Sequence, residues 1–327
     1  MLEHGGKLLR AAQHYGIPLT DWLDLSTGIN PEVYPVRAID PACWNRLPED
    51  DDGLEAAAAA YYGNDRLLVL PGSQAGIQAL PATFRPLVIA CVSPLYEEHP
   101  QAWERAGHKL RRLPILARAL AASTPNILLC NPCNPTAMVR PRAELLDAAA
   151  QLQRRGGWLI VDEAFADPEP ENGIAALAGS DEAPNLIVLR SLGKFFGLAG
   201  ARVGFVFGAA DKLDRLREML GPWPVAHPSR AVARQALEDF DWQAATRERL
   251  AASSQRLADL LAPLGEVART ALFCTLKSKQ IAELAEHFSL RAILTRQFDT
   301  HGLVRFGLPG SEAAWQRLAQ AVSEWNK

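Results

Sequence analysis

The sequence is poor in cysteine and methionine, with five and three among its 327 residues. The five cysteines are scattered and odd in number, which argues against a disulfide framework and favours a reducing, cytoplasmic compartment. Cys130 and Cys133 form a C-x-x-C pattern, but no second pair accompanies it, and the intervening and following prolines predict a turn after a strand. We therefore expect neither a disulfide nor a metal site.

Long apolar stretches and an excess of basic residues are also missing. No run approaches the roughly 20 apolar residues of a membrane helix, and the first residues lack the basic and apolar regions of a secretory signal. Lys and Arg number 34 against 37 Asp and Glu, a net charge of -3. A surface that binds nucleic acid needs cations to neutralise phosphates. The sequence thus predicts a small-molecule substrate, with no nucleic-acid or membrane partner.

Short apolar runs recur between residues 67 and 207, separated by helical patterns such as residues 141–155. Near-continuous apolar runs are typical of strands covered on both faces. Their alternation with helices predicts an α/β domain with a mainly parallel sheet. The predicted strands are residues 67–70, 87–92, 127–130, 158–161, 186–189 and 203–207, with a weaker candidate at 109–115.

The pattern changes after residue 210, and a chain of this length favours one large and one small domain. We expect an N-terminal arm with part of the small domain at 1–45, a large domain at 46–210, a connecting helix at 211–240 and a small α+β domain at 241–327. The elements expected after residue 210 are helices at 211–220, 229–261 and 281–288, strands at 271–276, 292–295 and 303–306, and a last helix with Ser311 as its N-cap.

Loops at the carboxyl ends of strands hold the functional residues of open α/β sheets, and four such loops contain suggestive side chains. Gly72 and Ser73 open a helix, whose free N–H groups form either a phosphate site or a plain N-cap turn. Asn134 begins the second of two Asn-Pro pairs and either binds a ligand or closes an Asx-turn. Asp162 ends an apolar strand, where burial requires a partner: a pyridinium nitrogen or a structural ion pair.

The fourth loop gives the strongest signal, because Lys194 lies among glycines and aromatic residues. Desolvation by Phe195 and Phe196 would lower the pKa of its amine and favour imine formation, whereas a solvated loop lysine is the alternative. Ser191 precedes Lys194 by three residues and Arg202 follows it by eight. Both could hold a phosphate, the arginine through its planar fork of donors.

In their order along the chain, these four motifs resemble the class I/II aminotransferase superfamily, fold type I of the enzymes that use pyridoxal 5'-phosphate (PLP). The resemblance covers nearly the whole chain and implies a large, mainly parallel αβα domain, a small α+β domain and a homodimer. It implies that Lys194 holds PLP as a Schiff base and moves protons, that Asp162 pairs with the pyridine nitrogen and that Asn134 bonds the ring's 3-hydroxyl. The other residues implied are Tyr96 stacking on the ring, Gly72, Ser73, Gln74, Ser191 and Arg202 at the cofactor phosphate, and Arg305 at the substrate's α-carboxylate.

Three positions depart from the family's pattern. Phe165 stands where the aspartate loop usually carries a tyrosine, so one hydrogen bond to the 3-hydroxyl would be absent. Leu47 stands where a tyrosine usually reaches the neighbouring subunit's cofactor phosphate. Ala137 replaces a usual glycine, which we expect to be a minor change.

The N-terminal segments point to one branch of the superfamily. His4-Gly5-Gly6 and Gly28-Ile29-Asn30 are similar to the start of the L-threonine-O-3-phosphate decarboxylases of the cobalamin pathway. The resemblance implies conversion of L-threonine O-3-phosphate, a small phosphorylated amino acid, to (R)-1-amino-2-propanol O-2-phosphate. The substrate ligands that it implies are His4, Gly5, Gly6, Gly28, Asn30, Asn134, Arg296 and Arg305.

Bond choice is a matter of orientation, because the bond that stands perpendicular to the PLP ring is the one that breaks. We therefore expect the grip on the substrate phosphate to decide between decarboxylation and transamination. Three alternatives stay open: a histidinol-phosphate-type aminotransferase, a non-catalytic PLP-binding regulator, and an assembly partner in the cobalamin pathway. The intact Lys194, Asp162 and Arg305 argue against the regulator.

Overall fold

The computed structural model describes residues 5–122 and 124–325, and the chain divides into two compact units. The larger unit comprises Tyr34–Asn134 and Val139–Ala244. The smaller unit is made of the chain's N-terminal part up to Val33, the short segment Pro135–Met138, and the chain from Ala245 onward. The larger unit thus takes in residues 34–45 and 211–244, which the sequence assigned mostly to an arm and a connecting helix.

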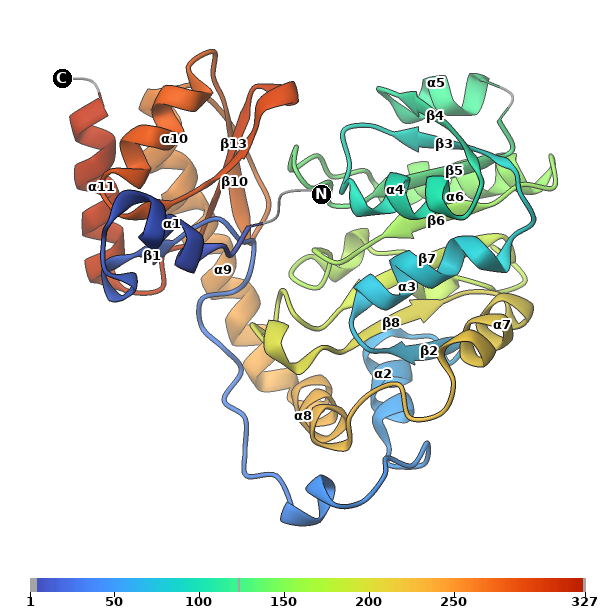
Figure 1. Cartoon of the computed structure of the whole chain (residues 1–327). Coiled ribbons are helices and arrows are strands. Elements are labelled where there is room, and N and C mark those ends of the chain that lie inside the picture. The colour runs from blue at the N-terminus through green and yellow to red at the C-terminus, as the bar shows by residue number, and fades with distance from the viewer. Residues whose placement is uncertain (1–4, 123, 326–327) are drawn as a thin grey trace. The chain divides into compact units, whose positions relative to one another are not determined.

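A seven-stranded sheet forms the centre of the larger unit, in the order β2-β8-β7-β6-β5-β3-β4 (Figure 1). Strands β3 to β7 pair in parallel, whereas β8 is antiparallel to both of its neighbours, β7 and β2. The prediction of a mainly parallel sheet is therefore confirmed. The strands are β2 (Leu67–Leu70), β3 (Val88–Val92), β4 (Lys109–Leu113), β5 (Asn126–Cys130), β6 (Leu159–Asp162), β7 (Leu186–Ser191) and β8 (Gly204–Phe207).

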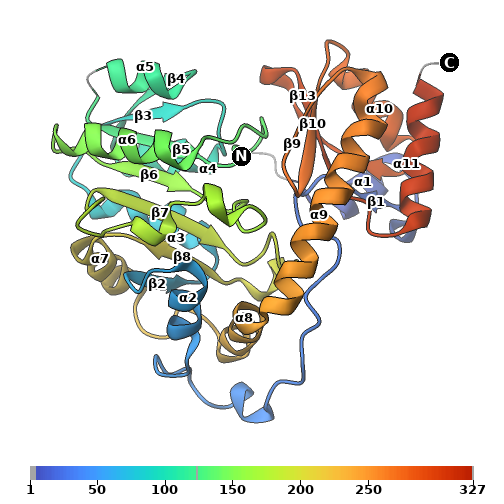
Figure 2. The same cartoon turned by 180° about the vertical axis from the view of Figure 1, so that it is seen from behind.

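Helices lie on both faces of this sheet. In Figure 1, α3 (Ser73–Ala79), α4 (Glu98–Arg105) and α7 (Ala210–Leu220) lie on the near face, and α3 contacts the other two. Figure 2 shows α2 (Leu54–Tyr62) and α6 (Arg142–Gln153) on the opposite face, where α8 (His227–Glu238) contacts α2 and α5 (Leu116–Ala121) contacts α6. Because both faces are covered, every residue of β5, β6 and β7 is buried.

The smaller unit contains a four-stranded antiparallel sheet, ordered β12-β13-β10-β9, and a two-stranded parallel pair of β1 and β11. The strand predicted at 292–295 is the short strand β11, which pairs with β1, and a separate short strand of the four-stranded sheet, β12, follows it directly. Strand β9 has a polar, largely exposed sequence, which is why no apolar run marked it. The elements are α1 (Leu8–Tyr15), β1 (Leu23–Asp24), β9 (Glu266–Arg269), β10 (Phe273–Lys277), α10 (Ile281–Ser289), β11 (Ile293–Leu294), β12 (Arg296–Phe298), β13 (Leu303–Gly307) and α11 (Glu312–Trp325).

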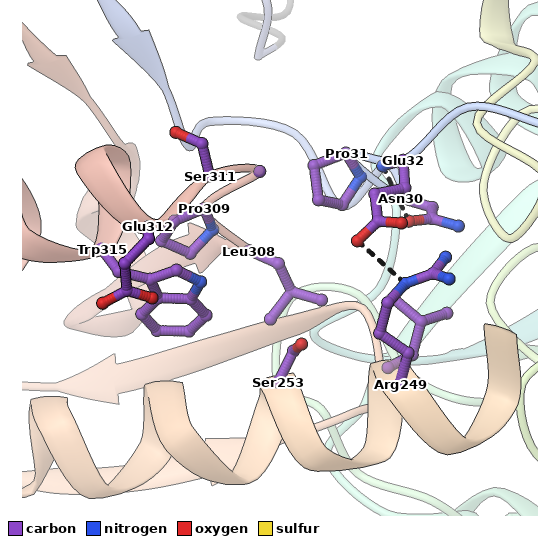
Figure 3. Close-up of a pocket in the computed structure, with 12 residues that line it drawn as sticks. Asn30, Pro31, Glu32, Arg249, Ser253, Leu308, Pro309, Ser311, Glu312 and Trp315 are labelled. Atoms are coloured by element: carbon purple, nitrogen blue, oxygen red, sulfur yellow. Dashed lines mark hydrogen bonds and ion pairs between the residues drawn. The ribbon is translucent and has the colours of Figure 1, made fainter. Parts of the chain in front are cut away.

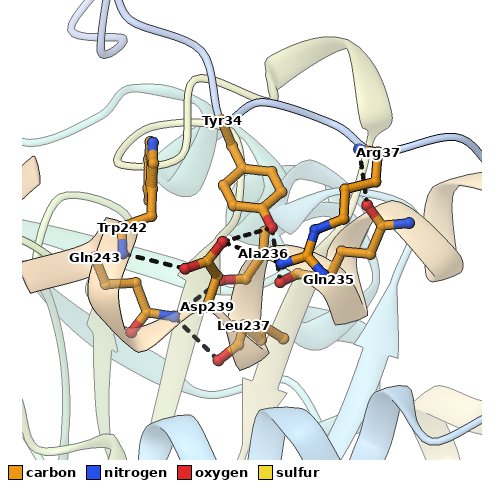
Figure 4. Close-up of polar contacts among 8 residues, drawn as sticks. All are labelled: Tyr34, Arg37, Gln235, Ala236, Leu237, Asp239, Trp242 and Gln243. Carbon is orange, nitrogen blue, oxygen red and sulfur yellow. Dashed lines mark hydrogen bonds and ion pairs between the residues drawn. The ribbon is translucent and has the colours of Figure 1, made fainter.

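The single helix predicted for residues 229–261 is wrong: the chain breaks at Asp239 between α8 and α9 (Phe240–Leu261). The Asp239 carboxylate accepts the N–H of Trp242 (3.1 Å) and so caps the first turn of α9. The side-chain amide of Gln243 donates to the last carbonyls of α8, those of Ala236 (2.9 Å) and Leu237 (3.0 Å). Figure 4 shows how both groups satisfy the two helix ends at the break.

Tyr34 contacts the same junction. Its hydroxyl donates to the Asp239 carboxylate (3.1 Å), and its backbone N–H donates to the carbonyl of Phe196 (2.9 Å). The last helix begins as predicted, since the N–H of Ala314 donates to the Ser311 hydroxyl (3.2 Å). In the described part of the chain, no helix has both the length and the apolar character needed to cross a membrane.

Candidate active site

Strand direction brings the predicted cofactor residues to one edge of the larger unit's sheet. Strand β8 is antiparallel to both β2 and β7, so β2 is parallel to β7 and to the strands beyond it. The carboxyl ends of β2, β5, β6 and β7 therefore meet at the same edge, where β8 begins. This edge carries Gly72 and Ser73 after β2, Asn134 after β5, Asp162 at the end of β6, Ser191 at the end of β7 and Arg202 just before β8.

Asp162 is buried and has a histidine partner that the sequence analysis missed. Nε2 of His99, a buried residue of α4, lies 2.7 Å from Oδ2 of Asp162. The other carboxylate oxygen accepts the N–H of Ala164 (2.9 Å). Cys130 is the third buried group here, and burial together with the Asp162 charge raises the pKa of its thiol well above the ordinary value. The strand-end carboxylate is thus held in place from two sides, next to a protonated thiol.

Tyr96 and Gln74 contact each other near the helix α4 that carries His99. The Tyr96 hydroxyl lies 3.4 Å from Oε1 of Gln74, and the Gln74 amide donates to the carboxylate of Glu98 (2.9 Å). The Tyr96 ring packs edge-on against the imidazole of His99, with ring centroids 6.3 Å apart. The predicted stacking residue is therefore oriented by contacts to α3 and α4. Tyr96 lies before the first residue of α4, so no helical spacing linked it to His99 in the sequence.

Lys194 is half-buried, three residues after the end of β7, and the next two residues are fully buried phenylalanines. Its Nζ lies 5.3 Å from the centroid of the Phe165 ring. Phe165 takes the position of the family's tyrosine and places an aromatic face beside the lysine without offering a hydroxyl. The apolar surroundings predicted for the amine are therefore present.

Glycines allow close contacts around the turn that begins α3. Gly72 has a φ of +78°, and a Cβ at this position would collide with the guanidinium of Arg202. A Cβ at Gly204 would collide with the backbone nitrogen of Ser73. Arg202 therefore lies directly against the turn that exposes the first N–H groups of α3. A guanidinium beside free N–H groups is a donor set that suits a phosphate.

A buried ionic cluster lies behind the strand ends, and the sequence analysis did not anticipate it. Nε of Arg190 lies 3.4 Å from Oε2 of Glu163, and its Nη1 lies 3.7 Å from the Asp167 carboxylate. Burial raises the pKa of Glu163, although the Arg190 charge opposes the shift. Glu163 directly follows Asp162 and Arg190 directly precedes Ser191, so this cluster joins the ends of β6 and β7.

Two predicted substrate ligands of the smaller unit face each other. Arg296 on β12 pairs directly with Arg305 on β13 in the antiparallel register. Arg305 is only 6% exposed, and its Nη2 donates to the carbonyl of Ser26 (2.7 Å). Like charges opposite each other on a ladder are unfavourable in isolation, so this arrangement suits a ligand with more than one negative group.

The N-terminal glycines lie beside the same strand. The N–H of Gly6 donates to the Ser26 hydroxyl (2.7 Å), and a Cβ at Gly5 would collide with the Ser26 carbonyl that also accepts from Arg305. Gly6 has a φ of +77°, which favours glycine at this close approach. Gly5 and Gly6 are therefore near Arg305, whereas His4 lies outside the described residues.

Gly28 and Asn30 are buried in the same unit, and Asn30 lines a separate hollow (Figure 3). The Asn30 side-chain oxygen accepts the N–H of Glu32 (3.0 Å), whose carboxylate pairs with Arg249 (3.0 Å). The lining of this hollow includes neither predicted arginine. The structure thus brings Gly5 and Gly6 to Arg305 but places Asn30 in different surroundings.

The remaining departures from the family's pattern also have defined places. Leu47 is 60% exposed in the larger unit. Ala137 has a φ of +60°, in the left-handed region that non-glycine residues rarely adopt. The family's glycine at this position therefore has a conformational reason, and the alanine is a strained replacement instead of a minor change.

The sequence matches the family Aminotransferase class I and II over residues 44–322. It is 51% identical to a threonine-phosphate decarboxylase of Pseudomonas aeruginosa, over 98% of this chain and 97% of that protein, and 39% identical to one of Sinorhizobium sp over 98% of each. A histidinol-phosphate aminotransferase of Mycobacterium bovis is 31% identical, over 86% of this chain and 80% of that protein.

Two solved structures share the fold. The histidinol-phosphate aminotransferase of Sinorhizobium meliloti in complex with pyridoxal-5'-phosphate has a TM-score of 0.78 at 19% identity, over 99% of this chain and 98% of that one. The L-threonine-O-3-phosphate decarboxylase of Porphyromonas gingivalis also has a TM-score of 0.78, at 20% identity, over 92% and 98%.

Fold and site together define an enzyme of the PLP-dependent aminotransferase fold, as predicted. The described residues fit this cofactor: an amine at Lys194, a buried carboxylate at Asp162 and a phosphate cradle between Gly72 and Arg202. The chain belongs to the class I and II aminotransferase family, and within it to the threonine-phosphate decarboxylases.

Proposed function

We propose that this chain is a PLP-dependent decarboxylase that converts L-threonine O-3-phosphate to (R)-1-amino-2-propanol O-2-phosphate for the nucleotide-loop linker of cobalamin. The observation that carries the proposal is the 51% identity to a threonine-phosphate decarboxylase over nearly the full length of both chains. The facing arginines of the smaller unit support it, because the substrate carries two anionic groups.

The chain's own residues would hold the cofactor through three kinds of contact. Nζ of Lys194 would provide the covalent attachment, the Asp162 carboxylate would accept a hydrogen bond from the pyridine nitrogen, and Arg202 with the first turn of α3 would bind the phosphate. When bound, PLP supplies an electron sink that stabilises negative charge at the substrate's Cα. His99 would keep the Asp162 carboxylate oriented through its 2.7 Å contact.

Substrate orientation is the task of the smaller unit's residues in this proposal. Arg305 binds the α-carboxylate in a bidentate manner, while Arg296, the Gly5–Gly6 backbone and His4 bind the phosphate. Fixing both ends of the substrate sets the rotation about Cα so that the bond to the carboxylate is the one that weakens. Carbon dioxide leaves, and Lys194 or a water delivers one proton to Cα.

The experiment is an incubation of the PLP-loaded protein with L-threonine O-3-phosphate without any keto acid. The proposal predicts carbon dioxide and amine product in equal amounts over many turnovers. The alternative, a histidinol-phosphate-type aminotransferase, is favoured only by relatives of lower identity. It predicts no carbon dioxide and turnover of histidinol phosphate that depends on a keto acid.

We also propose a cytoplasmic homodimer. All five cysteines are free, which suits a reducing compartment. Large apolar side chains are exposed on the larger unit at Trp44, Leu47, Met219 and Trp223, and such exposure is typical of a protein interface. Light scattering tests the assembly: a dimer has twice the 35.7 kDa mass of one chain.

A further inference from the structure

One aromatic ring contacts both facing arginines of the smaller unit. The Cζ atoms of Arg296 and Arg305 lie 5.1 Å and 5.8 Å from the centroid of the Phe298 ring. Residues 296 and 298 are two apart on β12, so their side chains leave the same face of the sheet. Arg305 is the direct cross-strand neighbour of Arg296 and shares that face. Both guanidinium groups are therefore within cation–π range of a single side chain.

The two arginines differ in how firmly the surrounding residues hold them. Arg305 is buried, donates to the Ser26 carbonyl at 2.7 Å and also lies 5.4 Å from the centroid of the Phe273 ring. Arg296 is half-buried, on the short strand β12. The Phe298 ring thus links a fixed guanidinium to a more exposed one. A rigid ring in this position restrains the distance between the two groups.

We propose that Phe298 determines substrate specificity by setting the spacing between the two anion-binding arginines. The ligand class that fits is a small molecule whose phosphate ester is on the carbon next to the one that bears the carboxylate, as in a 3-phosphorylated amino acid. The assignment of Arg305 to the carboxylate and Arg296 to the phosphate rests on the proposed function. The spacing itself rests on the geometry of the β12–β13 ladder and its shared ring.

The test is calorimetric titration of the full-length, PLP-loaded protein with two ligands that lack an amino group and are not turned over. One is 3-phosphonooxypropanoate, which has the substrate's spacing, and the other is 4-phosphonooxybutanoate, which is one carbon longer. The native protein should bind the shorter ligand more tightly. Phe298→Leu should reduce that preference by about fivefold, the loss of one cation–π contact of moderate strength. Phe298→Tyr keeps the ring and should keep the preference within about twofold.

Equal weakening of both ligands by Phe298→Leu would overturn the proposal, since it would mean that the ring supports the sheet without setting the spacing. An unchanged preference, or a native protein that binds both ligands equally or not at all, would also overturn it. Melting temperatures of the variants show whether each is folded. Because titration measures binding without turnover, a preference found in a protein that releases no carbon dioxide would sink the proposed function and leave this inference standing.

Discussion

Nε2 of His99 lies 2.7 Å from Oδ2 of Asp162, and both side chains are buried. The contact joins α4 to the end of β6, and the two residues are 63 positions apart in the sequence. A buried carboxylate needs hydrogen-bond partners to replace the water that it has lost. We therefore expect His99 to act as a positioning residue that holds the Asp162 carboxylate in a fixed orientation.

Replacing His99 by alanine should weaken PLP binding about tenfold or more, because a hydrogen bond to a buried charged group contributes about 1.5 to 3 kcal/mol. The apparent Kd of PLP, followed by absorbance, measures the effect. His14→Ala is the matched control, since His14 is exposed on α1. Cofactor affinity that is equal in the two variants would show that the imidazole has no part in orienting Asp162.

Arg296→Ala should lower kcat/KM for L-threonine O-3-phosphate by about 10- to 100-fold, the loss of a charge-assisted contact to the phosphate. His4→Ala should lower it in the same direction. Arg256→Ala is the control, because this exposed arginine pairs with Glu312. If kcat/KM is unchanged in both the Arg296 and the His4 variants, the assignment of the phosphate ligands is wrong.

Asp52→Asn should destabilise the folded chain by about 1 kcal/mol at neutral pH, a modest value because solvent screens this partly exposed carboxylate. Desolvation would raise the pKa of Asp52, but the hydrogen bonds from Arg230 (2.6 and 2.8 Å) outweigh it and lower the pKa. When the pKa of a carboxyl is lower in the folded than in the unfolded chain, the charged group stabilises the fold at pH values above its unfolded-state pKa. That stabilisation is lost as the pH falls through its folded-state pKa.

The difference in unfolding free energy between the native chain and Asp52→Asn should therefore shrink as the pH falls below about 4. Urea unfolding at several pH values measures it. Asp214→Asn, at an exposed ion pair with Arg217, should show little difference at any pH. A gap for Asp52→Asn that stays constant down to pH 3 would rule out the ion-pair explanation.

Ala137→Gly should stabilise the fold by up to about 1 kcal/mol, because the alanine holds a left-handed φ of +60°. Urea unfolding gives the change. Ala150→Gly, in the middle of α6, is the opposite control and should destabilise by about 1 kcal/mol. A loss of stability at position 137 similar to that at position 150 would show that the left-handed residue carries no strain.

Much of the fold follows from local sequence patterns. The apolar runs of β5, β6 and β7 were visible because strands covered on both faces need no polar alternation. Lys194 and Asp162 stood out because a charged group beside apolar residues is unusual. By contrast, the helix break at Asp239 is created by side chains that cap both ends, which helical periodicity alone does not reveal.

Long-range partners were the part that the sequence could not provide. The contacts of Asp162 with His99, and of Arg190 with Glu163 and Asp167, join residues far apart in the chain, and no spacing rule links them. The proximity of Gly6 to Ser26 is of the same kind. Motif order pointed to the candidate cofactor residues, whereas the structure was needed to find the side chains that contact them.

The most direct test of the central claim, that the carboxylate and not the Cα hydrogen is lost, uses L-threonine O-3-phosphate deuterated at Cα. Mass spectrometry of the amine product formed by the PLP-loaded protein without keto acid measures what happens to the label. Our account predicts 1-amino-2-propanol phosphate that keeps the deuterium and gains one hydrogen from solvent. Loss of the deuterium to solvent, with a keto product and no carbon dioxide, would contradict it and make the chain an aminotransferase.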